Sequence, residues 1–420
     1  MRAIAFVLSL ALIFVIPWEG MIRIPGLGTA AKALGLVVGV FWLATILITG
    51  RFRRLGPFHV AVALFVLWNA VSIFWSADVA QSVARVVTWV QLFVLVLVLW
   101  DLYTTRAALL AGLQAYVLGA YVAIASALAN YFAGNPYYST YQRFSPAETT
   151  NPDGFGFIVA LGIPLAWYLA SSKTTTGISQ SLRLVNFAYI PVAFMGIALS
   201  GTRTALIAAI PATVFGLASL TRLRPWARIA ILLLVASAIL ILLPEIRLMR
   251  SFQRLGTTYA ELTEGDLNNR LNNWREGVAT FTEHPLLGVG SSMYRSVNSL
   301  GKVAHNSFLS VLVELGLIGF ILFGVVLTIA FIQARSQPNW DSRFWLTILM
   351  VWAIGSSTLS WEYRKTTWVF LGLLIASAAL NVRREEAMPR LRPIEPETQP
   401  SMQMSPESLP PGETRKSYAA

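Results

Sequence analysis

Long apolar segments, separated by short polar connections, recur along the chain from residue 3 to residue 380. A helix needs about 20 apolar residues to cross the hydrocarbon core of a bilayer. Twelve segments approach that length, so we predict an all-α polytopic membrane protein with about twelve transmembrane helices. The predicted spans are residues 3–18, 32–49, 58–75, 82–100, 107–132, 153–170, 185–200, 204–220, 228–243, 306–333, 344–360 and 367–380.

The orientation of the spans follows from the Lys and Arg residues in their connections, because cytoplasmic connections are enriched in basic residues. The connections after spans two, six, eight, ten and twelve are basic and lie on one side. We predict that this side, with both termini, is cytoplasmic. The first segment follows Arg2 as in a signal peptide, but no small-residue cleavage site comes after it, so we interpret it as an uncleaved span.

The composition narrows the class of protein. Only 12% of the residues are charged and 56% are apolar, whereas an ordinary soluble domain has about 25% charged residues. These values exclude a soluble globular enzyme, a disordered protein and a nucleic-acid-binding protein. The net charge of +12 largely reflects the excess of basic residues on one face. The absence of cysteine excludes disulfides, thiolate metal sites and a cysteine nucleophile.

We divide the chain into four parts. Residues 1–243 are predicted to hold spans one to nine, 244–304 a large external loop, 305–380 spans ten to twelve, and 381–420 a disordered cytoplasmic tail. Within the loop we predict an amphipathic helix that begins after Asp266, ends at His284-Pro285 and covers the membrane or the bundle as a lid. Its apolar stripe consists of Leu267, Leu271, Trp274, Val278 and Phe281.

His305 lies where the large loop re-enters the membrane. If the helix continues through it, Leu309, Gly316 and Gly319 lie on the same face, and glycines allow another helix to approach closely. We therefore expect the imidazole to face the bundle, with interfacial anchoring as the alternative. Glu314 falls on the opposite face and deeper, where we expect a neutral acid or the partner of a cation on another helix.

Several arginines lie on the external side, where the positive-inside rule disfavours them. Arg203 lies in the turn from Ser200 to Thr204, Arg364 with Lys365 lies in the last external connection, and Arg143 lies in the loop 133–152. The guanidinium group is suited to holding phosphate oxygens bidentately. Cations at this depth fit the diphosphate of a lipid, although snorkelling is the simpler interpretation of each arginine alone.

The external loop 133–152 is rich in aromatic residues, among them Tyr138 and Tyr141. An aromatic belt at the membrane interface explains such residues, and stacking on sugar rings is the alternative. The sequence contains no His-x-x-x-His, no Asp-rich segment and no phosphate-binding loop. We therefore predict neither a metal site nor a cofactor, and any enzyme activity requires an already activated donor.

These residues together resemble the O-antigen ligase and polymerase superfamily. The family pattern of His, then Asn, Ser or Gln, nine residues, Gly, two residues and Gly, Thr or Tyr is matched by His305, Asn306, Gly316 and Gly319. Its Ser-x-Ser/Thr-Arg-Ser/Thr element is matched from Ser200 to Thr204. The resemblance covers roughly residues 60–380.

Further elements of the family follow the same order along the chain. Arg270 and Trp274 match its Arg-x-x-x-Trp element, and residues 284–290 match His-Pro-Leu-x-Gly-x-Gly. Residues 75–78 and 151–153 resemble weaker elements.

The resemblance implies a metal-independent inverting glycosyltransferase of the bacterial inner membrane, acting at the periplasmic face. Its donor is a glycan on undecaprenyl diphosphate, and its acceptor is a lipid A-core sugar or another glycan. In such a reaction we expect His305 to be the general base and Arg203, Arg270 and Arg364 to stabilise the departing diphosphate. Candidates for binding the acceptor or the glycan are Tyr138, Tyr141, Arg143 and Asn306.

The acceptor decides between an O-antigen ligase, which we favour, and an O-antigen or exopolysaccharide polymerase. The sequence does not separate these two. A membrane transporter is the alternative from another class. Transporters place charged groups near the membrane midplane and use broken helices in paired halves, whereas here most charges lie at the external edge. Membrane lipids are the other expected partners, and no nucleic acid is expected.

Overall fold

A computed structural model describes residues 1–171, 180–263, 265 and 269–387. Over these residues each predicted span coincides with one helix, which confirms the all-α class. Ten of these helices are long and apolar enough to cross a membrane, and α15 adds a shorter apolar segment, Lys365–Asn381. The helices are α1 Arg2–Val15, α2 Ala30–Thr49, α3 Pro57–Val71, α4 Val79–Leu102, α5 Arg106–Phe132, α6 Pro152–Ser171, α7 Gln180–Ser200, α8 Arg203–Ser219, α9 Pro225–Leu248, α13 Ser307–Arg335, α14 Asn339–Ser356 and α15 Lys365–Ala387.

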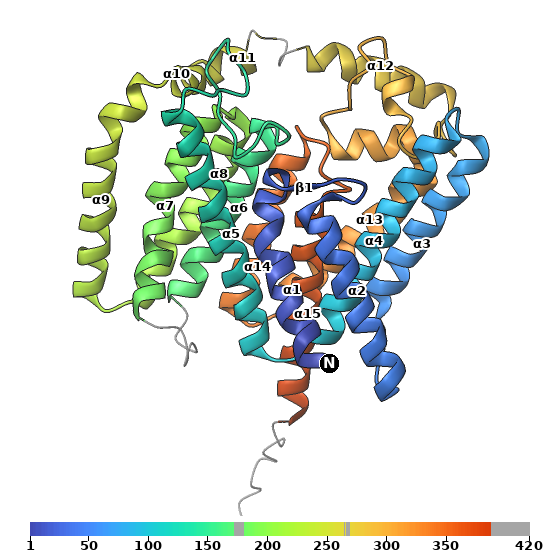
Figure 1. Ribbon diagram of the computed structural model, residues 1–420, viewed down its shortest axis with the longest axis horizontal. Coiled ribbons are helices and arrows are strands. Elements are labelled where there is room, and N and C mark those ends of the chain that lie inside the picture. Colours follow the sequence, from blue (N-terminus) through green and yellow to red (C-terminus); the bar gives the residue numbers. More distant parts are fainter. Residues whose placement is uncertain (172–179, 264, 266–268, 388–420) are drawn as a thin grey trace, which may run out of the picture.

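One end of the bundle, called the loop face below, is covered by the non-spanning elements (Figure 1). The N-terminus lies at the opposite end. The loop face is formed by α10 Arg250–Gly256, α11 Thr258–Thr263, α12 Arg270–Glu283 and a short antiparallel hairpin, β1 Arg23–Ile24 with β2 Gly28–Thr29. The described residues also include four short 3-10 helices: η1 Ile16–Met21, η2 Ser72–Trp75, η3 Leu220–Arg222 and η4 Tyr294–Ser296.

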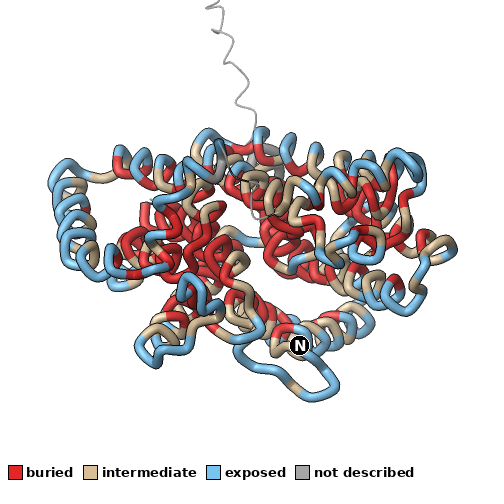
Figure 2. Tube along the Cα trace, turned by 90° about the horizontal axis from the view of Figure 1, so that it is seen from above, coloured by how far each residue is buried: buried red, intermediate tan, exposed pale blue. Residues whose placement is uncertain are grey.

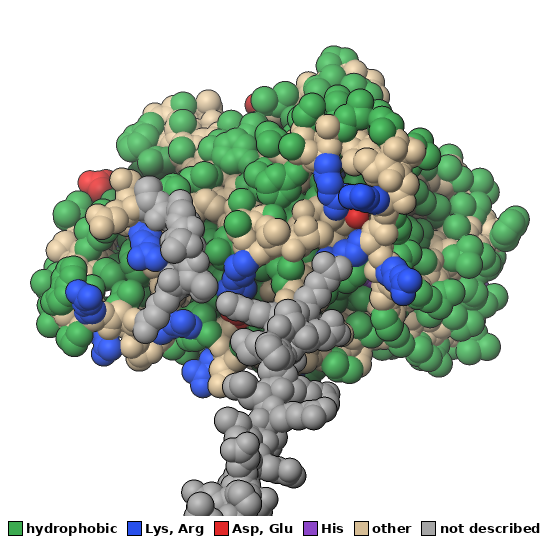
Figure 3. All heavy atoms as spheres, turned by 90° about the horizontal axis from the view of Figure 1, so that it is seen from below, with side chains coloured by type: hydrophobic (Ala, Val, Ile, Leu, Met, Phe, Trp, Pro, Cys, Tyr) green, Lys and Arg blue, Asp and Glu red, His purple; other side chains and the backbone are tan. Residues whose placement is uncertain are grey.

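The helices differ in how far they are enclosed. In α6, 94% of the most apolar stretch of the helix is buried, because α5, α7, α8 and α14 pack around it. In α9, at the edge of the bundle, the share is 11%. Figure 2 shows the same arrangement, with buried segments inside and exposed segments at the rim. Seen from the end opposite the loop face, Lys and Arg side chains lie on the end face and hydrophobic side chains cover the flanks (Figure 3).

Helix α13 is interrupted at Gly316, which has φ 65° and ψ −168°. Two helical hydrogen bonds are missing there, and the segment 285–290 replaces them. Leu317 N donates to Pro285 O at 2.9 Å and Ile318 N to Leu286 O at 3.4 Å. In return, Val313 O accepts from Val289 N at 3.0 Å, and Glu314 O accepts from Gly290 N at 2.8 Å. The loop is thereby built into a membrane helix.

This interruption corrects the expected glycine face. His305 has φ 49° and precedes the helix, which begins at Ser307, so its side chain is not in helical phase with Gly316. A Cβ on Gly316 would lie 2.2 Å from Leu286 O, so this glycine admits the loop rather than a second helix. A Cβ on Gly319 would lie 3.1 Å from the Trp68 ring, and there a helix, α3, does approach closely.

The loop and the tail also differ from the predicted boundaries. Helix α12 begins at Arg270, and the predicted cap Asp266 and stripe residue Leu267 lie outside the described residues. Its buried positions are Asn273 and Gly277, whereas Val278, predicted to be covered, is 51% exposed. Helix α15 continues to Ala387, past the boundary predicted at residue 380, and the remainder of the tail, 388–420, lies outside the described residues.

Candidate functional site

A polar cavity of about 560 Å³ lies between the hairpin, the beginning of α6, the segment 301–305 and the connection from α14 to α15. His305 and Asp153 line it, with Glu19 as the other acid. Five cationic side chains also line it, so its charge is positive: Arg23, Arg295, Lys302, Arg364 and Lys365. The cavity therefore combines a titratable imidazole with cations suited to an anionic ligand.

Helix α12 and the α14–α15 connection hold the segment that ends in His305. Trp274 Nε1 donates to Ala304 O at 2.8 Å, and Asn273 Nδ2 donates to Val303 O at 2.9 Å. The backbone N–H of His305 donates to Ser360 Oγ at 3.1 Å. The tryptophan of the Arg-x-x-x-Trp element thus positions the histidine.

The environment of His305 lowers its pKa to about 4. Burial is the main cause, and the charge of Arg270 adds to it, while Asp153 acts in the opposite direction. At neutral pH the imidazole is therefore neutral and has a free lone pair. It is a weaker base than the unperturbed histidine assumed from the sequence.

Asn306, expected to contact an acceptor, caps α13 instead. Its side-chain oxygen accepts from Phe308 N at 3.0 Å and from Leu309 N at 3.1 Å. An N-cap of this kind satisfies amides that have no partner within the helix. The Asn at this place in the family pattern therefore has a structural explanation.

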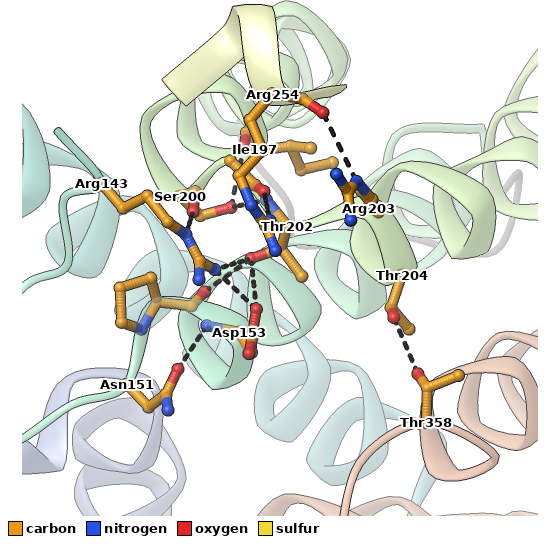
Figure 4. Close-up of polar contacts among 12 residues, drawn as sticks. Arg143, Asn151, Asp153, Ile197, Ser200, Thr202, Arg203, Thr204, Arg254 and Thr358 are labelled. Carbon is orange, nitrogen blue, oxygen red and sulfur yellow. Dashed lines mark hydrogen bonds and ion pairs between the residues drawn. The ribbon is translucent and has the colours of Figure 1, made fainter. Parts of the chain in front are cut away.

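Asp153 connects the cavity to a group of arginines (Figure 4). Arg143 donates to one of its carboxylate oxygens at 2.5 Å, and Arg270 lies 3.7 Å from the other. Thr202 Oγ1 lies 3.4 Å from Asp153 Oδ1 and 3.1 Å from Arg143. The side chain of Arg143 is only 7% exposed, and it also donates to Ser200 O at 2.7 Å. Its guanidinium is therefore occupied by the protein, which argues against the expected contact with an acceptor.

The turn from Ser200 to Thr204 organises these arginines. The carbonyl of Gly201 accepts from Arg254, and Gly201 has φ 59° with no room for a Cβ, which would lie 2.9 Å from Ser251 O. Arg203 donates to Arg254 O at 3.4 Å and to Thr257 Oγ1 at 2.7 Å. Thr204 hydrogen-bonds Thr358 at 2.7 Å, which ties the beginning of α8 to the connection after α14.

The structure separates the arginines that the sequence grouped. Arg364 lines the polar cavity, and Arg270 reaches it through Asp153. Arg203 is not among the residues that line it and instead contacts α10. Arg203 and Arg364 thus have different surroundings at the loop face.

The aromatic loop lies beside the same arginines. Tyr138 and Tyr141 are 43% and 46% exposed, and their rings lie 5.4 Å from the Arg143 guanidinium and 5.9 Å from that of Arg254, respectively. Neither lines the polar cavity, whereas Tyr137 does. The two tyrosines remain available on the surface above the arginine group.

Sequence reasoning missed two central residues. Asp153 was visible only as part of a weak family element, although an acid at the beginning of a predicted span is itself a signal. Arg254 lies among the basic residues of the large loop, and no pattern distinguishes it. Its pKa is lowered to about 10, chiefly by burial and then by neighbouring Arg143 and Arg203. Arg254 stays protonated at neutral pH, and the contribution of these two arginines to its lowered pKa reflects an electropositive site.

Glu314 has a structural explanation. Its carboxylate accepts from Ser292 N at 2.8 Å and from Tyr294 N at 3.3 Å, so it fastens the loop that follows residue 290. Within the described part of the chain, no group of three or more His, Asp or Glu residues is arranged to hold a metal ion.

The fold defines an all-α polytopic membrane protein whose loop face carries a positively charged cavity. Residues 188–324 match the family model described as O-Antigen ligase. This match confirms the resemblance to the O-antigen ligase and polymerase superfamily, and the matched range includes Arg203, Arg270 and His305. Members of the family are glycosyltransferase-like enzymes. No curated protein matches the chain by sequence.

Proposed function

We propose that the protein transfers a glycan from undecaprenyl diphosphate to an acceptor hydroxyl, and that the acceptor belongs to a lipid A-core, as in an O-antigen ligase. The observation that carries this proposal is the placement of His305 in one cavity with Arg364, Lys365 and Lys302. A base and an anion-binding group within one cavity are what this transfer requires.

The chemistry assigns each group one task. The acceptor hydroxyl attacks the anomeric carbon and loses its proton to the neutral imidazole of His305. The bond from that carbon to the diphosphate oxygen breaks, and the diphosphate leaves with the bonding electrons. Arg364 and Arg270 stabilise the charge that develops on it. Attack from the side opposite the leaving group inverts the anomeric centre, and no metal or cofactor takes part.

Arg203 has a supporting role in this proposal. Its contacts with Arg254 and Thr257 fix α10 against the beginning of α8. It therefore maintains the arginine group around Asp153 rather than contacting the leaving group. Tyr138 and Tyr141, exposed above that group, are the proposed contacts of the glycan.

The proposal places the loop face in the periplasm of a bacterial inner membrane. The basic end face opposite it supports this orientation, because basic residues favour the cytoplasmic side (Figure 3). The same transfer to the end of another glycan would make the protein a polymerase. A deletion strain distinguishes the two: unattached polymer indicates a ligase, and loss of polymer length indicates a polymerase.

The deciding experiment is transfer by the purified, reconstituted protein from an undecaprenyl-diphosphate glycan. We expect His305→Gln to lower the rate by about 10²- to 10⁴-fold, which is the contribution of a positioned general base. His284→Gln is the matched control, since His284 lies exposed at the end of α12, and it should transfer normally. A His305→Gln variant that turns over like the wild type would refute the assignment of the base.

A further inference from the structure

The polar cavity carries more positive charge than the donor diphosphate can neutralise. Lys365 is paired with Glu19 at 2.6 Å, and Arg143 and Arg270 share the carboxylate of Asp153. A diphosphate that is esterified at both ends has one negative charge on each phosphate. Within the part of the chain that the structure describes, the other four cations of the cavity lining form no ion pair: Arg23, Arg295, Lys302 and Arg364.

Two of these cations act on the proposed base. The charged groups that face the His305 imidazole are Arg270 from α12, Asp153 from α6, Lys302 from the segment 301–305 and Arg295 from η4. In an inverting displacement, the acceptor and the leaving group lie on opposite sides of the anomeric carbon. Cations beside the base therefore face the acceptor rather than the departing diphosphate.

The loop that precedes His305 holds both cations in place. Its centre is the buried side chain of Asn298, whose Nδ2 donates to Tyr294 O at 2.6 Å and to Lys302 O at 2.8 Å. The Oδ1 atom of the same side chain accepts from Lys302 N at 3.2 Å. Asn298 thus joins the two ends of the loop, which carry Arg295 and Lys302.

The pKa of His305 gives these cations a chemical consequence. General bases act best when their pKa lies near the working pH, whereas burial and the charges of Arg270, Lys302 and Arg295 lower the pKa of His305 to about 4. An anion bound against these cations offsets their charge and stabilises the imidazolium, so it raises this pKa. The base then becomes stronger only in the complex that reacts.

We propose that the cavity selects an acceptor that carries an acidic sugar, and that Arg295 and Lys302 bind its phosphate or carboxylate beside His305. Arg23 of the hairpin lines the same cavity and provides a further contact. Guanidinium groups bind both kinds of acid through paired N–H donors. This inference rests on the proposed function for the role of His305, and it adds the chemical class of the acceptor and the residues that recognise it.

The first test measures the pKa of His305 by NMR of the full-length protein in detergent. The chain has only three histidines, and His305→Gln assigns the signal. We expect glucose 6-phosphate or glucuronate to raise the pKa from about 4 to about 5 or above, and glucose to leave it unchanged. The acid that gives the larger rise identifies phosphate or carboxylate as the preferred group. No rise with either acid, or an equal rise with glucose, would overturn the proposal.

Arg295→Gln locates the binding site. It removes one of the charges that lower the pKa of His305, so we expect a higher pKa without sugar and a smaller rise with either acid. Arg275→Gln is the matched control and should behave as the wild type, because Arg275 is exposed on α12 and is not among the residues that line the cavity. An equal rise in Arg295→Gln and the wild type would show that the acid binds elsewhere.

The transfer assay tests the acceptor itself. We expect Arg295→Gln to raise the KM for an acidic acceptor about tenfold, which is the loss of one hydrogen bond to a charged group. The effect should be much smaller for the same acceptor after dephosphorylation or reduction of its carboxylates. If the wild type has the same KM for the acidic and the uncharged acceptor, the proposed selectivity is wrong.

Undecaprenyl diphosphate, added before the acidic sugar, separates this inference from the proposed function. If the acid still raises the pKa of His305, the cations serve a second anion and the inference stands. If undecaprenyl diphosphate alone gives the full rise and the acid adds nothing, the cations serve the donor, so the inference fails and the proposed function stands. If the acid raises the pKa but the wild type transfers glycan to no acceptor, the proposed function fails and the acid-binding site stands.

Discussion

Arg143 and Asp153 form a buried ion pair of 2.5 Å that joins the aromatic loop to the beginning of α6. Removal of Arg143 leaves the Asp153 carboxylate with Arg270, at 3.7 Å, as its nearest cation. Removing one partner of a buried ion pair costs about 3–5 kcal/mol. We therefore expect Arg143→Ala to lower the unfolding free energy by about 3 kcal/mol, measured by denaturant unfolding in detergent. Arg275→Ala is the control, because Arg275 is exposed on α12 and donates a hydrogen bond at the surface to Asn272. Equal stability of the two variants would show that the pair is not stabilising.

The glycine at the interruption of α13 should tolerate no side chain. Gly316→Ala forces alanine to adopt a positive φ and places its Cβ against Leu286 O. We therefore expect the free energy of unfolding to fall by about 1–3 kcal/mol. Gly324→Ala, in a regular turn of the same helix with open space around it, should instead be neutral or stabilising by up to about 1 kcal/mol. Thermal unfolding of both variants checks this contrast. A stable Gly316→Ala variant would contradict the docked loop.

The pH dependence of transfer should follow the lowered pKa of His305. Because the pKa is about 4, the imidazole stays neutral as the pH falls from 8 to about 5, and the base form is lost only as the pH passes through about 4. We therefore expect kcat/KM to show no titration near pH 6.5. A decline of activity centred near pH 6.5 would indicate an unperturbed, solvent-accessible imidazole and a different arrangement of the cavity. EDTA should have no effect at any pH.

The absence of cysteine allows a direct test of topology. A cysteine introduced at Tyr259, which is 79% exposed on α11, should react with a membrane-impermeant maleimide in cells whose inner membrane is intact. A cysteine at Arg224, in the connection between α8 and α9, should react only after lysis. The reverse pattern would place the loop face in the cytoplasm and overturn the proposed site of transfer.

The sequence predicted the helices well because each span needs a long apolar segment, and that requirement is local. It also identified the elements around His305, Arg270 and Trp274. The detailed roles depended on contacts between distant segments. The helical phase assigned to His305 assumed unbroken hydrogen bonding, whereas Gly316 interrupts α13 to accept the segment 285–290. No periodicity reveals such a partner.

The arginine group illustrates the same limit. The sequence singled out Arg203 because the predicted topology puts it on the side of the membrane where basic residues are rare. That prediction concerns the side of the membrane and does not say which residues Arg203 contacts. Its position beside Arg254, and the position of Asp153 between Arg143 and Arg270, arise from the packing of α6, α8, α10 and α12. The pattern of apolar segments predicts how deep a residue lies in the membrane, but it does not predict which residues of other helices lie beside it.

The docking of residues 285–290 into α13 also constrains the order of assembly. Amides of Leu317 and Ile318 lack their usual helical acceptors and find them in the loop, and hydrocarbon offers no water as a substitute. Helix α13 therefore reaches its final form only after the segment 285–290 has folded back onto it. Completion of α13 and folding of the loop are then one event, and a chain arrested before that step would leave these amides unpaired.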